Sequence, residues 1–228
     1  MMMWLLLIGV PLLVGMWAQM QVSGAFHKWK QVAASSGVTG AQAAREILAA
    51  ANIRDVEVLE INDMLGDHYD PAHKRLCLST EVYRTPSVAA LGIAAHECGH
   101  AIQHQKGYAP LQWRMAIVPV TQIASNMLPF IFLGGLFFGI FKLAVVAVGV
   151  YLVLTVFQLI TLPVEFDASR RAKIILQQLG MVRSGEEAAG VNKVLNAAAL
   201  TYVAAFVASL GTLLYYLMIL TGNRSDER

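Results

Sequence analysis

The sequence of 228 residues is poor in charge and in cysteine, and both shortages narrow the class of protein. Charged residues make up only 14% of the chain, whereas soluble domains contain about 25%. Hydrophobic residues make up 57%, and the mean hydropathy is +0.55. Two cysteines, Cys77 and Cys98, are too few for a disulfide framework. This composition predicts a membrane protein that is not held together by disulfides.

Neither sign of charge is in large excess, because the formal net charge is +2. The chain has no basic stripe with interleaved aromatic residues, so we expect no nucleic-acid partner. The apolar stretch from Met115 to Val164 contains one charge, Lys142. Transport paths through a membrane usually need ionisable residues, and their scarcity here argues against a metal transporter.

The strongest chemical motif is His96-Glu97-Cys98-Gly99-His100. Residues four apart on a helix lie on one face, about 6 Å apart along the axis, so His96 and His100 can bind one metal ion. Glu97 points into the same pocket and is placed to take a proton from an attacking water. Cys98 is turned about 200° from His96 and is expected to be a small buried residue. The spacing indicates a metallopeptidase.

Two histidines at this spacing also arise by chance, and a buried histidine is more often a core residue than a ligand. The context favours the metal site. Small apolar residues precede the motif, Thr85-Pro86-Ser87 is a helix-start signal, and Lys106-Gly107 is a stop signal. We therefore expect a helix from about Pro86 to Gln105.

His104 continues the row of histidines, but it would lie about 12 Å from His96 along the axis, too far to bind the same ion. The longer HExxHxxGxxH pattern also fails, because Gln103 stands at its glycine. We expect His104 to be a helix-end residue near the cavity.

Hydropathy divides the chain into alternating apolar and polar parts. The parts expected are a transmembrane helix at 1–20, a cytoplasm-facing zincin-like domain with the HExxH helix at 21–114, two transmembrane helices at 115–164 with a turn near Lys142, a helix and loop at 165–195, a fourth transmembrane helix at 196–221, and a tail at 222–228. The first apolar stretch has neither a basic flank before it nor a small-x-small cleavage site after it, so we expect an uncleaved anchor rather than a signal peptide.

Local signals also predict the elements of the polar domain. Thr39 to Gln42 forms a capping box that opens a helix ending near Ala51. Residues 56–61 and 74–79 are expected to be strands, with a hairpin turn around 70–73. A strand in front of the HExxH helix could bind an extended peptide through main-chain hydrogen bonds.

The apolar hairpin at 115–164 should return the chain to the side that carries the motif. Glu165 then emerges beside the motif domain and can reach the two histidines. We expect a helix from about Val164 to Leu179, closed by Gly180, and a second capping box at 184–187.

Basic residues gather on the side of the motif. They are Lys28, Lys30, Arg45, Arg54, Lys74, Arg75, Arg84, Lys106, Arg114, Arg170, Arg171, Lys173, Arg183 and Lys193. The other side has Lys142, Arg224 and Arg228. The positive-inside rule therefore predicts an active site that faces the cytoplasm.

Three stretches together resemble the YugP-like neutral zinc metallopeptidases of bacterial membranes. They are the HExGHAIQH helix, residues 67–71 with 76–79, and residues 164–170. More distantly, Glu165 and Ala168 resemble a segment of the HtpX-type membrane peptidases in which the glutamate is the third zinc ligand. That pattern has an aspartate four residues after the glutamate, where this chain has Ser169, and Asp167 lies two residues earlier.

The resemblance implies a multi-pass protein of the bacterial inner membrane, mainly α-helical, with about four transmembrane helices and a small α+β zincin-like metallopeptidase domain. Zn²⁺, one ion per chain, is expected on His96, His100 and Glu165, with Glu97 as the general base of an endopeptidase. The alternative is a zinc-binding membrane scaffold without turnover, against which the intact Glu97 counts.

Five further residues are candidates for supporting roles. Asp167 or Ser169 is expected to orient a ligand histidine. The candidates for stabilising the oxyanion are His68, Tyr69 and Arg170. The expected partners are the lipid bilayer and a polypeptide substrate, including membrane proteins.

Overall fold

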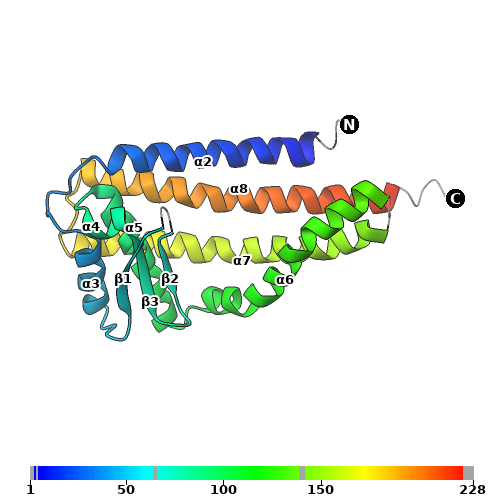
Figure 1. Cartoon of the computed structure of the whole chain (residues 1–228). Helices are drawn as coiled ribbons and strands as arrows, with labels where there is room; N and C mark the ends of the chain where they lie inside the picture. Colours follow the sequence, from blue (N-terminus) through cyan, green and yellow to red (C-terminus); the bar gives the residue numbers. More distant parts are fainter. Residues whose placement is uncertain (1–2, 4, 64–65, 139–141, 223–228) are drawn as a thin grey trace. The chain divides into compact units, whose positions relative to one another are not determined.

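The computed structural model describes residues 3, 5–63, 66–138 and 142–222, which fall into two units (Figure 1). The first unit takes its residues from 1–18, 113–162 and 201–228. The second unit comprises 19–112 and 163–200. Long helices contribute residues to both units, and the HExxH motif belongs entirely to the second.

Four helices among the described residues are long and apolar enough to cross a membrane, as the sequence predicts. They are α2 (Val10–Trp29), which continues the π-helix η1 (Leu5–Gly9), α6 (Ala109–Phe138), α7 (Lys142–Gln178) and α8 (Glu186–Gly222). In the first unit their apolar side chains are widely exposed, with Phe130 at 76% and Leu13 at 65%. Such a surface is suited to lipid rather than to water.

The long helices differ in extent from the predicted segments. The first helix runs to Trp29 rather than ending at Met20. The helix expected to begin at Val164 is the second half of α7, which continues through Pro163. A proline removes one main-chain hydrogen bond and is tolerated within membrane helices. The turn predicted near Lys142 involves residues 139–141, which lie outside the described residues.

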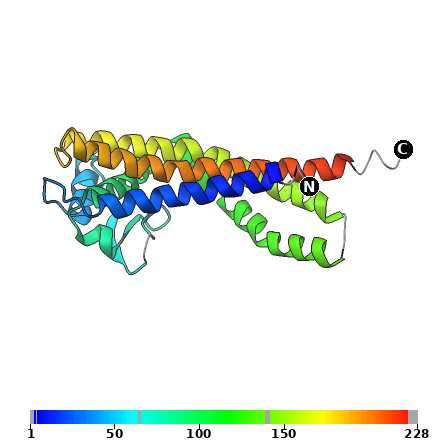
Figure 2. The same ribbon diagram turned by 90° about the horizontal axis from the view of Figure 1, so that it is seen from above.

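In the first unit, α2 and α8 lie side by side in both views (Figure 2). Gly211 makes this contact possible, because a Cβ atom there would lie 2.2 Å from the carbonyl oxygen of Leu7. Only a residue without a side chain lets two helix backbones approach so closely.

The second unit contains a small sheet among helices. Its remaining elements are α3 (Gly40–Ala50), β1 (Glu57–Ile61), β2 (His68–Asp70), β3 (Arg75–Ser79), α4 (Thr80–Arg84) and α5 (Val88–Gln105). The strands have the order β1-β3-β2. A turn around 70–73 is present, but it joins β2 to β3, which are antiparallel. The prediction that residues 56–61 and 74–79 form the hairpin is wrong, because β1 and β3 pair in parallel. β2 was not predicted, because it has only three residues and lies inside a segment rich in turn formers.

The core of the second unit is built around α5. Leu76 and Leu78 of β3, Ile47 of α3 and Leu91 of α5 are fully buried there. The sheet and α3 therefore pack against the helix that carries the motif, and they fix its position.

Hydrogen bonds at the helix ends show why the helices begin where they do. The predicted capping box of α3 is present, with Thr39 and Gln42 bonded to each other's backbone. α5 begins two residues later than predicted, because its cap is Ser87, whose hydroxyl accepts from the backbone N–H of Ala90 at 3.2 Å. The box predicted at 184–187 is replaced by another contact, in which Glu187 accepts from the N–H groups of Arg183 and Ser35, each at 2.9 Å.

Candidate metal centre

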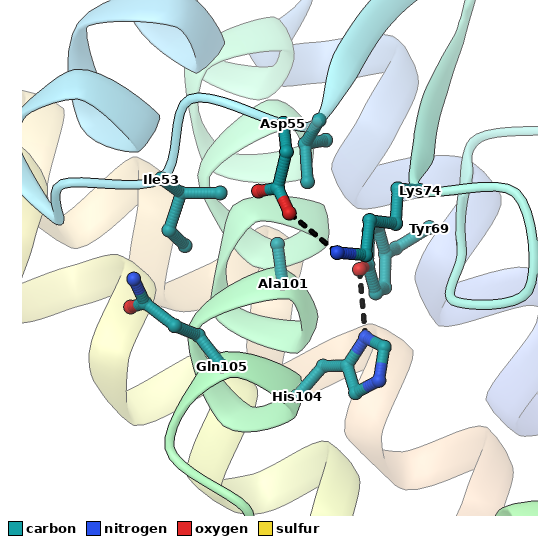
Figure 3. Close-up of a pocket in the computed structure, with 8 residues that line it drawn as sticks. Ile53, Asp55, Tyr69, Lys74, Ala101, His104 and Gln105 are labelled. Atoms are coloured by element: carbon teal, nitrogen blue, oxygen red, sulfur yellow. Dashed lines mark hydrogen bonds and ion pairs between the residues drawn. The ribbon is translucent and has the colours of Figure 1, made fainter.

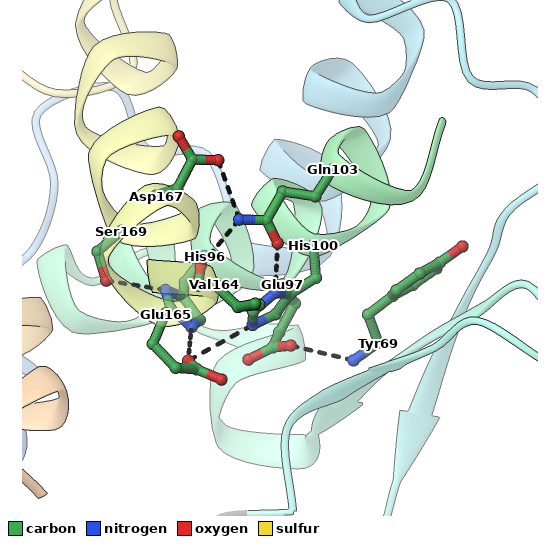
Figure 4. A network of polar contacts seen from close by, with 9 residues as sticks. All are labelled: Tyr69, His96, Glu97, His100, Gln103, Val164, Glu165, Asp167 and Ser169. Carbon is green, nitrogen blue, oxygen red and sulfur yellow. Dashed lines mark hydrogen bonds and ion pairs between the residues drawn. The ribbon is translucent and has the colours of Figure 1, made fainter. Parts of the chain in front are cut away.

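His96, His100 and Glu165 converge at one place in the second unit (Figure 4). The two histidines lie on one face of α5, and Glu165 comes from α7. Nε2 of His96 lies 3.1 Å from Oε2 of Glu165, and Nε2 of His100 lies 3.6 Å from the same oxygen. One donor atom from each residue lies within 4.8 Å of the other two. The structure thus brings together the three residues expected to be ligands.

A close contact between α5 and α7 makes this convergence possible. Gly99 lies inside the motif, and a Cβ atom on it would lie 2.7 Å from the carbonyl oxygen of Ala168 and 3.1 Å from its Cα. The two backbones therefore touch, about one helical turn beyond Glu165. Any larger residue at position 99 would push Glu165 away from the histidines.

Glu165 and His100 are buried, and His96 is mostly covered. Glu165 is 2% exposed and His100 is 8% exposed, while the side chain of His96 is 13% exposed. A buried carboxylate needs a compensating charge or hydrogen bonds. Two imidazoles and one carboxylate form a donor set used by catalytic zinc sites, which leave a further position for water. The residues present therefore fit a zinc ion.

Glu97 lies beside this cluster and is also buried. Its Oε2 accepts a hydrogen bond from the backbone N–H of Tyr69 at 3.0 Å, so the edge strand β2 fixes the orientation of the carboxylate. Burial raises the pKa of Glu97, and the neighbouring His96 and His100 oppose that shift. A carboxyl group whose pKa is raised toward neutrality is suited to accepting a proton.

The two candidates for orienting a ligand histidine have different contacts. Ser169 Oγ lies 3.1 Å from Nδ1 of His96. Asp167 is linked to His100 through a third residue, Gln103. Oε1 of Gln103 lies 3.0 Å from Nδ1 of His100, and its Nε2 donates to Asp167 Oδ2 at 3.0 Å.

In the sequence, Gln103 stands out only as a departure from a glycine pattern, and its place beside the site was not predicted. One signal was available, since Gln103 lies three residues after His100, and residues at that spacing are neighbours on a helix. Its partners on α7 lie 61 to 64 positions away and could not be identified from local spacing.

The three oxyanion candidates have their side chains engaged elsewhere. His68 is exposed, and its Nδ1 contacts the carbonyl oxygen of Gly66 at 2.6 Å. The ring of Tyr69 points away from Glu97 (Figure 4), and its hydroxyl lies 2.9 Å from Nδ1 of His104. Arg170 forms an ion pair with Asp167, and 63% of its side chain is exposed.

Tyr69 and His104 line a separate pocket of about 190 Å³ under the sheet (Figure 3). The other lining residues are Ile53, Asp55, Val56, Lys74, Ala101 and Gln105. Lys74 forms an ion pair with Asp55 at its rim. Burial raises the pKa of Tyr69 to about 12, so its hydroxyl stays protonated at neutral pH.

Comparison with known proteins defines the class. Over residues 3–221 the chain matches the family described as "Putative neutral zinc metallopeptidase", and it belongs to that family. It is also similar to a particular curated protein, the "Putative membrane protease YugP" of Bacillus subtilis (strain 168). The two are 47% identical over 211 residues, which cover 92% of this chain and 93% of the relative. No solved structure matches the chain significantly. The resemblance inferred from the sequence is confirmed.

Proposed function

We propose that the chain is a membrane-bound, zinc-dependent endopeptidase, in which His96, His100 and Glu165 hold one zinc ion per chain and Glu97 is the general base. The observation that carries the proposal is the buried cluster of two imidazoles and a carboxylate with a second buried carboxylate beside it. A zinc ion held there would supply Lewis-acid chemistry, polarising a peptide carbonyl and making water nucleophilic at neutral pH.

The residues of the chain supply the proton transfers. The Glu97 carboxylate takes a proton from the attacking water and returns it to the leaving amine. The hydrogen bond from the Tyr69 N–H to Oε2 of Glu97 holds the carboxylate in place during both steps. Tyr69 would therefore assist catalysis through its backbone N–H, which holds Glu97. Its side-chain hydroxyl lies in the separate pocket lined by His104.

The proposed substrate is a polypeptide met at the membrane surface, including membrane proteins. β2 is an edge strand of the sheet, the kind of element to which extended peptides add through main-chain hydrogen bonds. Glu165 belongs to a helix long and apolar enough to cross the bilayer, which supports a site near the membrane. We place the protein in the bacterial inner membrane as a multi-pass protein with its site toward the cytoplasm.

The alternative function, a zinc-binding scaffold without turnover, fits the cluster less well. Structural zinc sites are usually closed by four protein ligands. Among the described residues, the cluster contains three possible ligands. Glu97 lies beside them, and a site that only binds zinc has no need of such a proton acceptor.

The test compares zinc content and proteolysis of the detergent-purified protein with those of Glu97→Gln. Both proteins should retain zinc, and the variant should cleave a denatured polypeptide such as casein about 10²–10⁴-fold more slowly, because it lacks the proton acceptor. Glu46→Gln, an exposed position on α3, is the control and should behave as wild type. A wild-type protein that binds zinc and cleaves neither casein nor membrane-embedded substrates would support the scaffold instead.

A further inference from the structure

We infer that Gln103 is a positioning residue that determines which nitrogen of His100 is offered to the metal ion, and that it does so by connecting His100 to α7. The inference rests on the proposed function, because it takes His100 to be a zinc ligand. It concerns a residue outside the HExxH motif and outside the proposed ligand set.

The contacts of Gln103 fix the orientation of its amide. One end of the amide lies 2.8 Å from the carbonyl oxygen of Val164 and 3.0 Å from Oδ2 of Asp167. A carbonyl oxygen and an ionised carboxylate can only accept hydrogen bonds. Two independent acceptors therefore require the NH₂ group at this end, and the amide oxygen faces His100.

This orientation fixes the tautomer of His100. The amide oxygen of Gln103 can only accept, so Nδ1 of His100, at 3.0 Å, carries the proton. In a neutral ring the lone pair is then on Nε2, and this is the nitrogen that faces Glu165 at 3.6 Å. Gln103 thereby presents His100 in the form that binds a metal ion.

No other residue type offers the same set of bonds in this position. Gln103 is fully buried, and both ends of its amide have partners. Leucine would leave the Nδ1 proton of His100 and the Val164 carbonyl oxygen without these partners. Glutamate would keep the acceptor for His100 but place a second carboxylate against Asp167, since it lacks the NH₂ group.

The partner on α7 is itself held in place. Asp167 is 8% exposed and accepts from Nε of Arg171 at 2.5 Å, and Arg170 pairs with its other oxygen. The hydrogen bonds from His100 to Gln103 and from Gln103 to Asp167 thus join α5, which supplies two of the proposed ligands, to α7, which supplies the third. This link does not require the metal ion.

The experiment measures the zinc dissociation constant of the full-length protein in detergent, by competition with a chelator of known affinity. Gln103→Leu should bind zinc about 10–100-fold more weakly than wild type, the usual cost of losing a residue that orients a ligand. Gln105→Leu is the matched control on the same helix, because Gln105 is exposed and its amide contacts only the Asn52 carbonyl at 3.3 Å among the described residues. The control should bind zinc as wild type does.

The visible spectrum of the cobalt-substituted protein is a second readout, because it reports the geometry around the ion and is independent of turnover. It should change in Gln103→Leu and stay the same in Gln105→Leu. Wild-type zinc affinity and an unchanged spectrum in a folded Gln103→Leu protein would overturn the inference while leaving the proposed function standing. A wild-type protein that binds no zinc would overturn the proposed function itself.

A second set of variants keeps the side-chain volume, in case Gln103→Leu does not fold. Gln103→Glu should weaken zinc binding, because two carboxylates would face each other. Combining it with Asp167→Asn restores an NH₂ group opposite a carboxylate and should recover part of the affinity, while the Val164 carbonyl oxygen still lacks its donor. If Gln103→Glu alone binds as tightly as wild type, or if the combined variant is no better than Gln103→Glu, the inference is wrong.

Discussion

The two histidines of the cluster are held by different chemical groups. The amide oxygen beside His100 can only accept a hydrogen bond, whereas the Ser169 hydroxyl beside His96 can donate or accept. Ser169 therefore steadies the ring of His96 without fixing its tautomer. The two histidine side chains are almost equally exposed, at 13% for His96 and 11% for His100, so the difference between them lies in their partners.

Ser169→Ala should therefore weaken zinc binding only about fivefold, which corresponds to about 1 kcal/mol for one neutral hydrogen bond. The same chelator competition measures the effect, with the exposed Ser184→Ala as the control. A loss as large as that expected for Gln103→Leu would show that both histidines are fixed equally firmly.

At the scale of elements, the site depends on how closely α5 approaches α7. Two glycines of α5 allow a direct comparison. A Cβ atom at Gly99 would lie 2.7 Å from a backbone oxygen of α7, whereas one at Gly92 would meet Val191 at an ordinary 3.6 Å. The first glycine is required by the contact between helices, and the second is not.

Gly99→Ala should lower the free energy of unfolding by about 1–3 kcal/mol, the usual cost of overpacking, because two backbones would have to separate. It should also weaken zinc binding by moving Glu165. Gly92→Ala is the control, and it should be neutral or stabilise the protein by up to about 1 kcal/mol, since alanine favours helix more than glycine. Denaturant unfolding of the metal-free proteins in detergent measures both, and equal stability of the two variants would contradict the account.

The same elements show what the sequence predicts and where it stops. The long apolar helices, the Thr39 capping box and the HExxH spacing are local patterns, and each is present in the structure. Pairings between distant segments are not local. The parallel pairing of β1 with β3 and the contact between Gly99 and Ala168 have no signal within a short window. Glu165 lies 69 positions from His96, and it was proposed as a ligand from the expected return of the apolar hairpin and from the family resemblance rather than from local spacing.

At the scale of the whole molecule, the distribution of charge predicts which side of the membrane carries the site. Fourteen basic residues are expected on the side of the motif, and three on the other. The positive-inside rule then predicts a metal centre that faces the cytoplasm. Long loops count less in this rule, so the flank of the first span, with Lys28 and Lys30, and the cluster of Arg170, Arg171 and Lys173 weigh most in this prediction.

This orientation can be tested with a single introduced thiol, because Cys77 and Cys98 are both buried. Gln178→Cys places a thiol at the exposed end of α7. In intact bacteria a membrane-impermeant maleimide should label it only after permeabilisation. Ser225→Cys, in the tail assigned by sequence to the opposite side, should be labelled without permeabilisation. The reverse pattern would place the site outside the cytoplasm.

In the proposed metal centre, α7 completes the zinc site that α5 begins, so the zinc content of Glu165→Ala is the first quantity to measure. The wild-type protein, purified in detergent and dialysed against a weak chelator, should retain about one zinc ion per chain, as a site with three protein ligands does. Glu165→Ala should retain a small fraction of that, and Glu46→Ala should match wild type. If Glu165→Ala retains zinc as wild type does, Glu165 is not the third ligand and the proposed metal centre is wrong.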